Sequence, residues 1–233
     1  MLPLSIHARL LPGFRFILYA LYALPVLAMA AAVVSKPTKI LILGDSLTEG
    51  LGVDKDDAFP ALLDKQLQAW RPGYDVINGG SSGSTSASGV RRLKWYEKAK
   101  PDIVLLALGS NDGLRGVKPE ETARNVEAAI KYCQERKWQV ILTGLRVPPN
   151  YGPEYVNAFA KIYPGLAIRY KLPIVEFLLQ GVAGEPALNQ ADGIHPNEKG
   201  HKRIADNLAA FLKPLLAQRD SAATAGPESR QNR

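Results

Sequence analysis

The chain of 233 residues is long enough for one domain with a sizeable core, and its 46% hydrophobic and 22% charged residues exclude a collagen, a coiled coil or a mostly disordered chain. The net charge of +7 would suit a nucleic-acid binder, but the lysines and arginines are spread along the sequence and no nucleic-acid motif occurs. We therefore interpret the charge as a solvated basic surface. The single cysteine, Cys133, excludes an intramolecular disulfide, and the three histidines form no ligand-like cluster, so we expect no metal.

The first 35 residues differ from the rest of the chain. Two arginines precede an uncharged run at 16–34, and Ala28-Met29-Ala30 fits the small-x-small pattern of a signal-peptide cleavage site. Cleavage would leave a periplasmic or secreted domain that begins near Ala31. The alternative is an uncleaved anchor in the inner membrane, contacting the bilayer through 16–34, because this run approaches the roughly 20 residues needed to span it. Either way we expect the globular part to leave the cytoplasm.

Short, nearly all-apolar runs recur along the rest of the chain, as is typical of strands buried on both faces of a parallel sheet. The predicted strands are 39–44, 74–79, 102–109, 138–144 and 172–177. Helix-like segments follow them at 59–70, 90–100, 119–137, 155–170 and 197–216, with a kink expected at Pro164.

This strand–helix alternation predicts right-handed crossovers between parallel strands. We expect an α/β fold, a three-layer α/β/α sandwich around a flavodoxin-like five-stranded parallel sheet. The domain should span 36–217. The polar, small-residue-rich segment 218–233 is interpreted as a disordered tail.

Polar residues follow the predicted strands at the edge where parallel sheets carry their functional groups. Ser46 follows the first strand and Asn111 the third, whereas Asp192 and His195 come after the fifth. A serine hydroxyl needs a base to become a nucleophile, and an imidazole can be that base near neutral pH. Asp192 could fix the tautomer of His195 by accepting its Nδ1 proton. This set predicts acyl transfer with Ser46, His195 and Asp192 as a catalytic triad.

Acyl transfer also needs donors for the negatively charged oxygen of the tetrahedral intermediate. The backbone N–H groups of Ser46 and Gly83 and the side chain of Asn111 could form this oxyanion hole. Asp45 is interpreted as a structural residue that holds the turn before Ser46. Taken singly, each residue has an ordinary explanation, as a helix cap or a turn residue. Their joint occurrence at strand ends makes the catalytic interpretation the stronger one.

Four blocks resemble those of SGNH (GDSL-type) hydrolases, namely GDSLTEG, GGSSGST, GSND and DGIHPN. The segments GSNDGLRG, VPPNYGPEY and FAKIYPGLA resemble the bacterial esterase/thioesterase I and lysophospholipase branch, and the similarity covers about 39–216. By position it implies Ser46 as nucleophile, Asp192 and His195 as the acid–base pair, and Gly83 and Asn111 as oxyanion donors. Gly80 is the alternative to Gly83.

The resemblance further implies catalysis without metal or organic cofactor, and a groove between the loops after Asn111 and Leu145. The apolar residues expected to hold an acyl chain there are Leu114, Val147, Pro148 and Tyr151. Ser110 stands where the branch often has glycine. His201, the other histidine of the domain, lies in a predicted helix and is expected at the surface.

Three functions stay open at this point. The first is an extracytoplasmic serine hydrolase of carboxylic esters and thioesters, whose partner is a small-molecule acyl substrate and not nucleic acid. The second is a carbohydrate O-deacetylase on the same fold. The third is a non-catalytic phosphate or nucleotide binder using 79–89, although neither G-x-x-x-x-G-K-[ST] nor G-x-G-x-x-G occurs.

Overall fold

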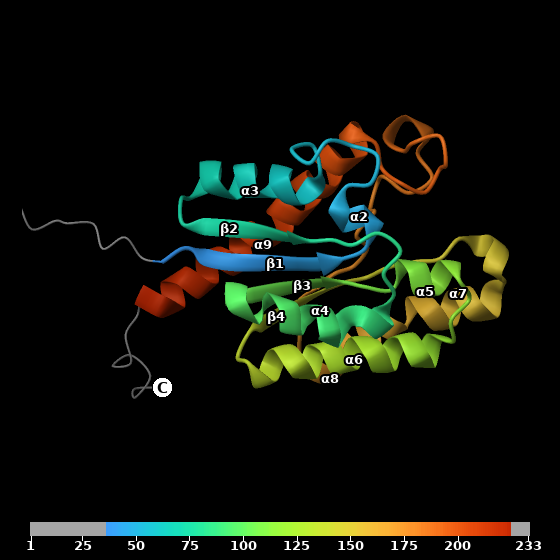
Figure 1. Cartoon of the computed structure of the whole chain (residues 1–233), viewed down its shortest axis with the longest axis horizontal. Coiled ribbons are helices and arrows are strands. Elements are labelled where there is room, and N and C mark those ends of the chain that lie inside the picture. The colour runs from blue at the N-terminus through green and yellow to red at the C-terminus, as the bar shows by residue number, and fades with distance from the viewer. Residues whose placement is uncertain (1–35, 225–233) are drawn as a thin grey trace, which may run out of the picture. The chain divides into compact units, whose positions relative to one another are not determined.

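The computed structural model of the chain describes residues 36–224. Five parallel strands form one sheet in the order β2-β1-β3-β4-β5 (Figure 1). The strands are β1 Thr38–Gly44, β2 Tyr74–Gly79, β3 Ile103–Ala107, β4 Gln139–Thr143 and β5 Ile174–Val175. This order confirms the predicted flavodoxin-like sheet. The leader predicted at 1–35 lies outside the described residues.

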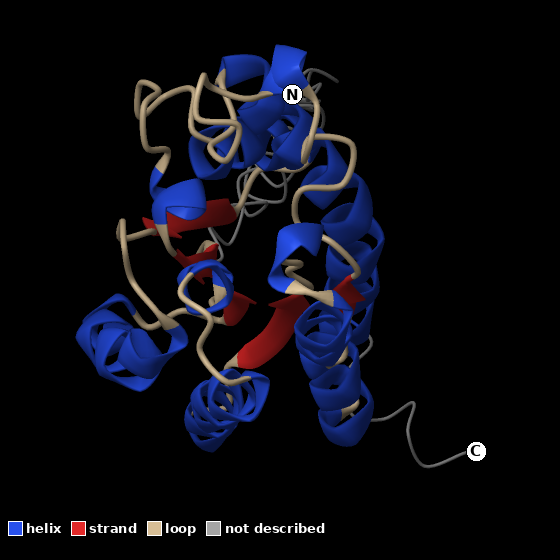
Figure 2. Cartoon of the chain, turned by 90° about the vertical axis from the view of Figure 1, so that its right-hand side faces the viewer, coloured by secondary structure: helices blue, strands red, loops and turns tan. Residues whose placement is uncertain are grey.

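Helices cover both faces of the sheet, which Figure 2 shows from the edge where the strands end. The helix α3 (Phe59–Trp70) packs with α9 (Glu198–Thr224) on one face, and α6 (Pro119–Glu135) packs with α4 (Gly89–Tyr96) and α8 (Ile162–Tyr170) on the other. The predicted three-layer α/β/α sandwich is therefore confirmed. The remaining helical elements are short: α2 Ser46–Glu49, α5 Ser110–Leu114, α7 Pro153–Ala160, η1 Ser86–Ser88, η2 Glu97–Ala99, η3 Pro149–Tyr151 and η4 Pro186–Leu188.

The central strand shows why apolar runs predicted the sheet well. Ile40 to Leu43 of β1 are fully buried, since β1 has β2 and β3 as neighbours and helices on both faces. Cys133 of α6 is buried in the same core, and burial raises the pKa of its thiol to about 12. This thiol is an inert core group, as the sequence indicates.

Two helix predictions need correction. The segment predicted as one helix kinked at Pro164 is two helices, and α7 ends at Ala160, before the proline. A proline ring clashes with the carbonyl four residues earlier, which here belongs to residue 160, and Pro164 sits without penalty in the first turn of α8.

The predicted disordered tail is also wrong for its first part, because α9 continues to Thr224. Arg219 Nη1 donates to Thr38 Oγ1 at 3.0 Å, and Asp220 accepts from Tyr74 Oη at 2.6 Å and from Arg71 at 2.9 Å. These contacts fasten the end of α9 to the beginnings of β1 and β2. Residues 225–233 lie outside the described part. No helix within 36–224 is both long and apolar enough to cross a membrane.

Candidate active site

Ser46 is placed by a tight turn at the end of β1. Asp45 caps the short helix α2, since its Oδ1 accepts the Leu47 N–H at 3.1 Å. Gly44 is required before it, because a Cβ there would lie 1.9 Å from Thr48 Oγ1. Asp45 is 1% exposed, and this burial raises the pKa of its carboxyl group, partly offset by the bond from Leu47. The expectation that Asp45 holds the turn agrees with this geometry.

His195 reaches Ser46 from a loop far along the sequence. Its Nε2 lies 3.0 Å from Ser46 Oγ, and its Nδ1 lies 2.6 Å from Asp192 Oδ2. Since an ionised carboxylate can only accept, Nδ1 carries the ring proton and Nε2 is free to accept from the serine. The three side chains predicted as a triad are thus joined in one chain of hydrogen bonds.

The loop holds this pair by its own backbone. Asp192 Oδ1 accepts hydrogen bonds from the backbone N–H groups of Ile194 and His195, both at 2.9 Å. One carboxylate therefore stabilises both the backbone of the turn and, through Oδ2, the orientation of the His195 ring. Gln190 N–H donates to the His195 carbonyl at 2.8 Å. The bond from His195, followed by those backbone N–H groups, lowers the pKa of Asp192 to about 2. Asp192 is therefore ionised at neutral pH.

Asn111 follows β3, where Gly109 takes a φ of 126° that favours glycine and turns the chain into α5. One Nδ2 hydrogen of Asn111 is donated to the Ser84 carbonyl at 3.0 Å. The next residue, Asp112, is 1% exposed and accepts the Ser86 N–H at 2.8 Å and the Thr122 hydroxyl at 3.3 Å. Sequence reasoning gave Asp112 no role; it ties the loop after β2 to the end of β3.

The two candidate glycines of the loop after β2 differ in geometry. The Gly80 N–H donates to Asn78 Oδ1 at 2.8 Å, and a Cβ at Gly80 would lie 2.1 Å from the Glu49 nitrogen. Gly83 is exposed with a φ of 72°, and its carbonyl accepts from Arg115 at 3.1 Å. Gly80 thus packs the loop against α2 with its donor already engaged.

A cavity of about 480 Å³ opens beside the hydrogen-bonded Ser46 and His195. Three of the residues predicted to bind an acyl chain, Leu114, Val147 and Pro148, line it together with Asn111. Sequence reasoning missed several further lining residues, which come from separate loops: Leu145, Arg146, Phe177, Leu179 and Ile194. The guanidinium of Arg146 lies 4.7 Å from the centre of the Phe177 ring, so its charge sits at an otherwise mainly apolar wall.

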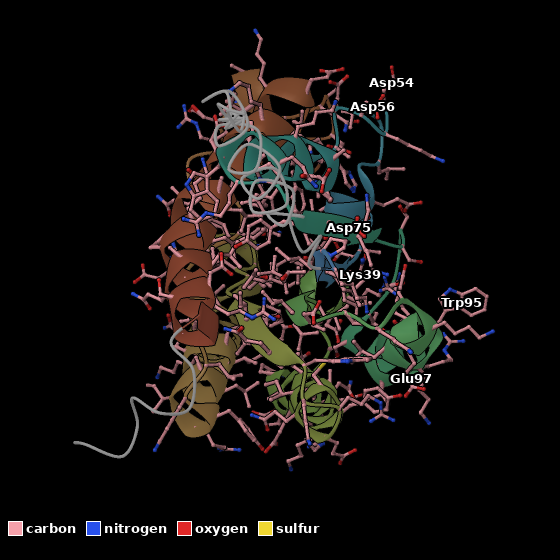
Figure 3. All side chains as sticks on the ribbon, turned by 90° about the vertical axis from the view of Figure 1, so that its left-hand side faces the viewer. Lys39, Asp54, Asp56, Asp75, Trp95 and Glu97 are labelled. Carbon is pink, nitrogen blue, oxygen red and sulfur yellow. The ribbon has the colours of Figure 1, made fainter. Side chains whose placement is uncertain are left out.

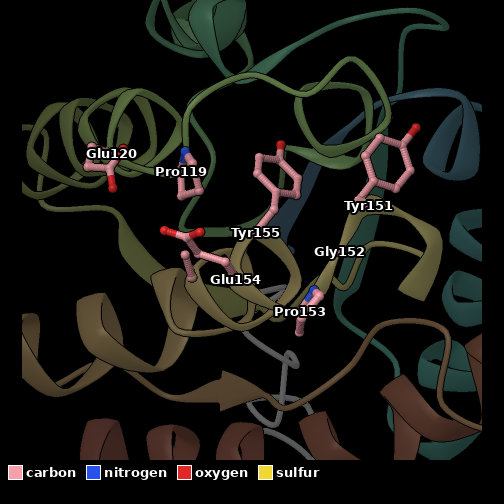
Figure 4. Close-up of a pocket in the computed structure, with 8 residues that line it drawn as sticks. Pro119, Glu120, Tyr151, Gly152, Pro153, Glu154 and Tyr155 are labelled. Atoms are coloured by element: carbon pink, nitrogen blue, oxygen red, sulfur yellow. The ribbon is translucent and has the colours of Figure 1, made fainter.

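Tyr151 is the predicted pocket residue that does not line this cavity. Its hydroxyl donates to the Leu114 carbonyl at 2.7 Å, and the residue contributes to the lining of a second hollow of about 560 Å³ (Figure 4). Pro119, Glu120, Glu154 and Tyr155 line that hollow as well. The described residues that surround it include no serine, cysteine or histidine, whereas the first cavity has both Ser46 and His195 in its lining.

His201 is not at the surface, contrary to the prediction. It is 1% exposed, accepts the Phe59 N–H on Nδ1 at 3.2 Å and stacks on the Phe59 ring at 6.1 Å. Burial lowers the pKa of its ring to about 4. Its position three residues before Ile204 and seven before Leu208 places it on the buried face of α9, a signal present in the sequence.

The sheet topology and the hydrogen-bonded Ser46, His195 and Asp192 define the architecture of a serine hydrolase. Residues 42–203 match the GDSL-like lipase/acylhydrolase family, and the chain belongs to this family.

Named relatives agree with this assignment. The chain is 40% identical over 178 residues to Esterase TesA of Pseudomonas aeruginosa, which covers 76% of this chain and 89% of the relative. It is 39% identical to thioesterase 1/protease 1/lysophospholipase L1 of Escherichia coli, covering 76% and 84%. The solved structure of the psychrotrophic esterase EstA from Pseudoalteromonas sp., inhibited by monoethylphosphonate, is similar with a TM-score of 0.74 at 32% identity, covering 77% of this chain and 99% of that one. The family resemblance found in the four sequence blocks is confirmed.

Proposed function

We propose that this protein is a serine esterase that hydrolyses carboxylic esters and thioesters through an acyl-enzyme, with Ser46 as nucleophile. The observation that carries the proposal is the chain from Ser46 Oγ through His195 to Asp192, with separations of 3.0 and 2.6 Å, beside an apolar cavity. Nucleophile, base and orienting carboxylate each stand in the relation that acyl transfer requires. The esterase and thioesterase names of the relatives support the same reaction.

In the proposed acylation step, Ser46 Oγ attacks the carbonyl carbon of the substrate while His195 Nε2 takes the hydroxyl proton. The carbonyl electron pair moves onto oxygen, and Asp192 stabilises the imidazolium that forms. When the intermediate collapses, the alcohol or thiol leaves with the proton from His195. A water molecule activated by the same imidazole then releases the acid and restores Ser46.

The negatively charged oxygen of the intermediate needs donors already in place. We assign this role to the Ser46 N–H, the Gly83 N–H and the Asn111 side chain. The Ser46 N–H begins a helix and has no partner within it. Asn111 donates one Nδ2 hydrogen to Ser84 and keeps the second for substrate. The engaged N–H of Gly80 favours Gly83 over that alternative.

The acyl side of the substrate is proposed to lie along Leu114, Val147 and Pro148. A mainly apolar wall suits a hydrocarbon chain, and a cavity of about 480 Å³ is far larger than an acetyl group needs. This favours medium or longer acyl groups over the carbohydrate O-deacetylase alternative.

The proposal also places the domain outside the cytoplasm, on the basis of its leader segment. Segment 1–35 is proposed to carry the domain across the inner membrane, either releasing it by cleavage near Ala31 or keeping it anchored through 16–34. N-terminal sequencing of the protein recovered from the periplasmic and membrane fractions separates the two outcomes.

The test of the proposed reaction is Ser46→Ala, assayed with a series of p-nitrophenyl acyl esters and with acyl thioesters. We expect kcat to fall by about 10⁴-fold or more, because the proposed acyl-enzyme forms on the Ser46 hydroxyl that this substitution removes. Thermal unfolding should be nearly unchanged, and Ser84→Ala, which removes a hydroxyl from a nearby loop, is the matched control. Turnover retained in pure Ser46→Ala protein would reject the proposal.

A further inference from the structure

The outer surface of α4 and η2 carries an unusual group of side chains. Arg91, Lys94, Trp95 and Lys98 are all exposed, and their spacing of three, four and seven residues places them along one side of the helix. Trp95 is 80% exposed and projects from the ribbon in Figure 3. We name these four residues the Trp95 face. The group therefore combines three cations with an exposed indole, a side chain that is enriched at protein interfaces and at the membrane surface.

The charge of the Trp95 face is only partly balanced nearby, because Glu97 attracts Lys94 without forming an ion pair with it. Glu97, the acid that interrupts it in sequence, is held by Arg136 at 2.5 Å and by the Tyr132 hydroxyl of α6. Within residues 36–224, no carboxylate lies at ion-pair distance from the three cations of the face. The face therefore presents three positive charges around one large apolar ring.

We propose that the Trp95 face docks on the surface of an anionic lipid bilayer. Indole rings settle at the boundary between headgroups and acyl chains, because one edge of the ring is polar and the rest is apolar. Lysine and arginine beside the ring are attracted to anionic headgroups. A combination of an inserted aromatic ring and surrounding cations is how proteins bind the bilayer surface without spanning it.

The aromatic content of the surface favours a bilayer over a nucleic acid. Among residues 36–224, Trp95 is the one aromatic side chain that is exposed. A binder of single-stranded nucleic acid stacks successive bases on several aromatic side chains, so a single exposed indole beside cations suits the bilayer surface better.

The experiment uses the full chain and the fluorescence of Trp95. Vesicles of phosphatidylcholine are compared with vesicles of phosphatidylcholine and phosphatidylglycerol in equal amounts, and both kinds carry the same fraction of brominated phosphatidylcholine as the quencher. We expect quenching that requires the anionic lipid, weakens with added salt and is missing in Trp95→Phe, which reports the background of Trp70 and Trp138. Two arginines of the leader are also attracted to anionic lipid, so the part of the dependence assigned to the Trp95 face is the part that the charge variants of the face remove.

Charge variants test the cations separately. Lys94→Gln/Lys98→Gln should weaken the docking constant from quenching titrations by about 25-fold, at about fivefold for each cation near an anionic surface. The control variant Lys199→Gln/Arg203→Gln removes two exposed charges from α9, which lies on the other face of the sheet. It should change the docking constant less than twofold. Ester turnover in solution should be the same in all these variants, which confirms that they are folded.

Equal quenching by both vesicle types, or equal loss in the two charge variants, would overturn the proposal. A Trp95 signal that ignores vesicles but responds to a single-stranded oligonucleotide would also overturn it, in favour of nucleic acid. None of these results depends on the acyl-transfer assignment of Ser46.

Discussion

The two histidines of the domain lie six residues apart and have opposite environments. His195 sits in a loop with a hydrogen-bonding partner on each ring nitrogen, Asp192 on one side and Ser46 on the other. His201 is enclosed in α9 against Phe59, with only Nδ1 bonded and Nε2 buried without a partner among the described residues. The same side chain is thus a candidate base in one place and a packed core group in the other. Partners and burial decide the chemistry, and substitutions at both positions can separate the two roles.

The largest effect is expected at His195. His195→Gln removes the base, so kcat/KM for acyl esters should fall by about 10⁴- to 10⁶-fold, as when one member of a catalytic triad is lost. Thermal unfolding should change little, because the ring packs in a loop. Steady-state kinetics measures the loss of kcat/KM, and thermal denaturation of the same sample measures its stability. His201→Gln is the contrasting control; a comparable loss of activity in that variant would remove the distinction between the two sites.

A smaller effect is expected when a donor to the intermediate is removed. Asn111→Ala should lower kcat by about 10²- to 10³-fold, or about 2.7–4 kcal/mol in the barrier, with KM changed much less. The reason is that Nδ2 is proposed to strengthen its bond as charge develops on the substrate oxygen. Asn111 also donates to the Ser84 carbonyl, so the substitution could destabilise the fold. The Tm of the variant should therefore be measured together with its kinetics. A variant with raised KM and unchanged kcat would show that Asn111 binds the ground state instead.

The smallest effect on activity is expected at His201, where the change is in stability. The ring has a folded pKa of about 4 against 6.5 in the unfolded chain. The unfolded state therefore takes up the proton first, and stability is lost as pH falls from about 6.5 to about 4, by about 3 kcal/mol in total. His201→Leu should lack this loss.

At pH 7, His201→Leu leaves the Phe59 N–H without an acceptor, which costs about 1–3 kcal/mol. The stability gap between wild type and variant should therefore shrink on acidification. Denaturant unfolding at several pH values measures it, and parallel pH profiles for the two proteins would contradict the assigned environment of His201.

The strands and the polar residues that follow them were predictable because local sequence determines them. A run such as Ile40–Leu43 favours a strand buried on both faces of a sheet, and Ser46 and Asn111 lie within a few residues of the ends of such runs. The expected positions of Asp192 and His195 at the same edge follow from parallel topology. These predictions needed no knowledge of side-chain packing.

The features that sequence reasoning missed depend on contacts between distant segments. The buried Asp112 is explained by Ser86 of another loop, and the extension of α9 by partners of Arg219 and Asp220 on the first two strands. Tyr151 does not line the acyl cavity, and its hydroxyl is hydrogen-bonded to the Leu114 carbonyl. His201 is a different case, since the helical spacing already indicated a buried face.

The most direct test of the account is covalent labelling of the resting enzyme with a fluorophosphonate, followed by peptide mass spectrometry. We predict a single adduct on Ser46, formed as ester hydrolysis is lost, and a rate of labelling that falls steeply in His195→Gln and little in His201→Gln. An enzyme that loses activity with its adduct on another residue, or that hydrolyses esters while Ser46 stays unmodified, would contradict it.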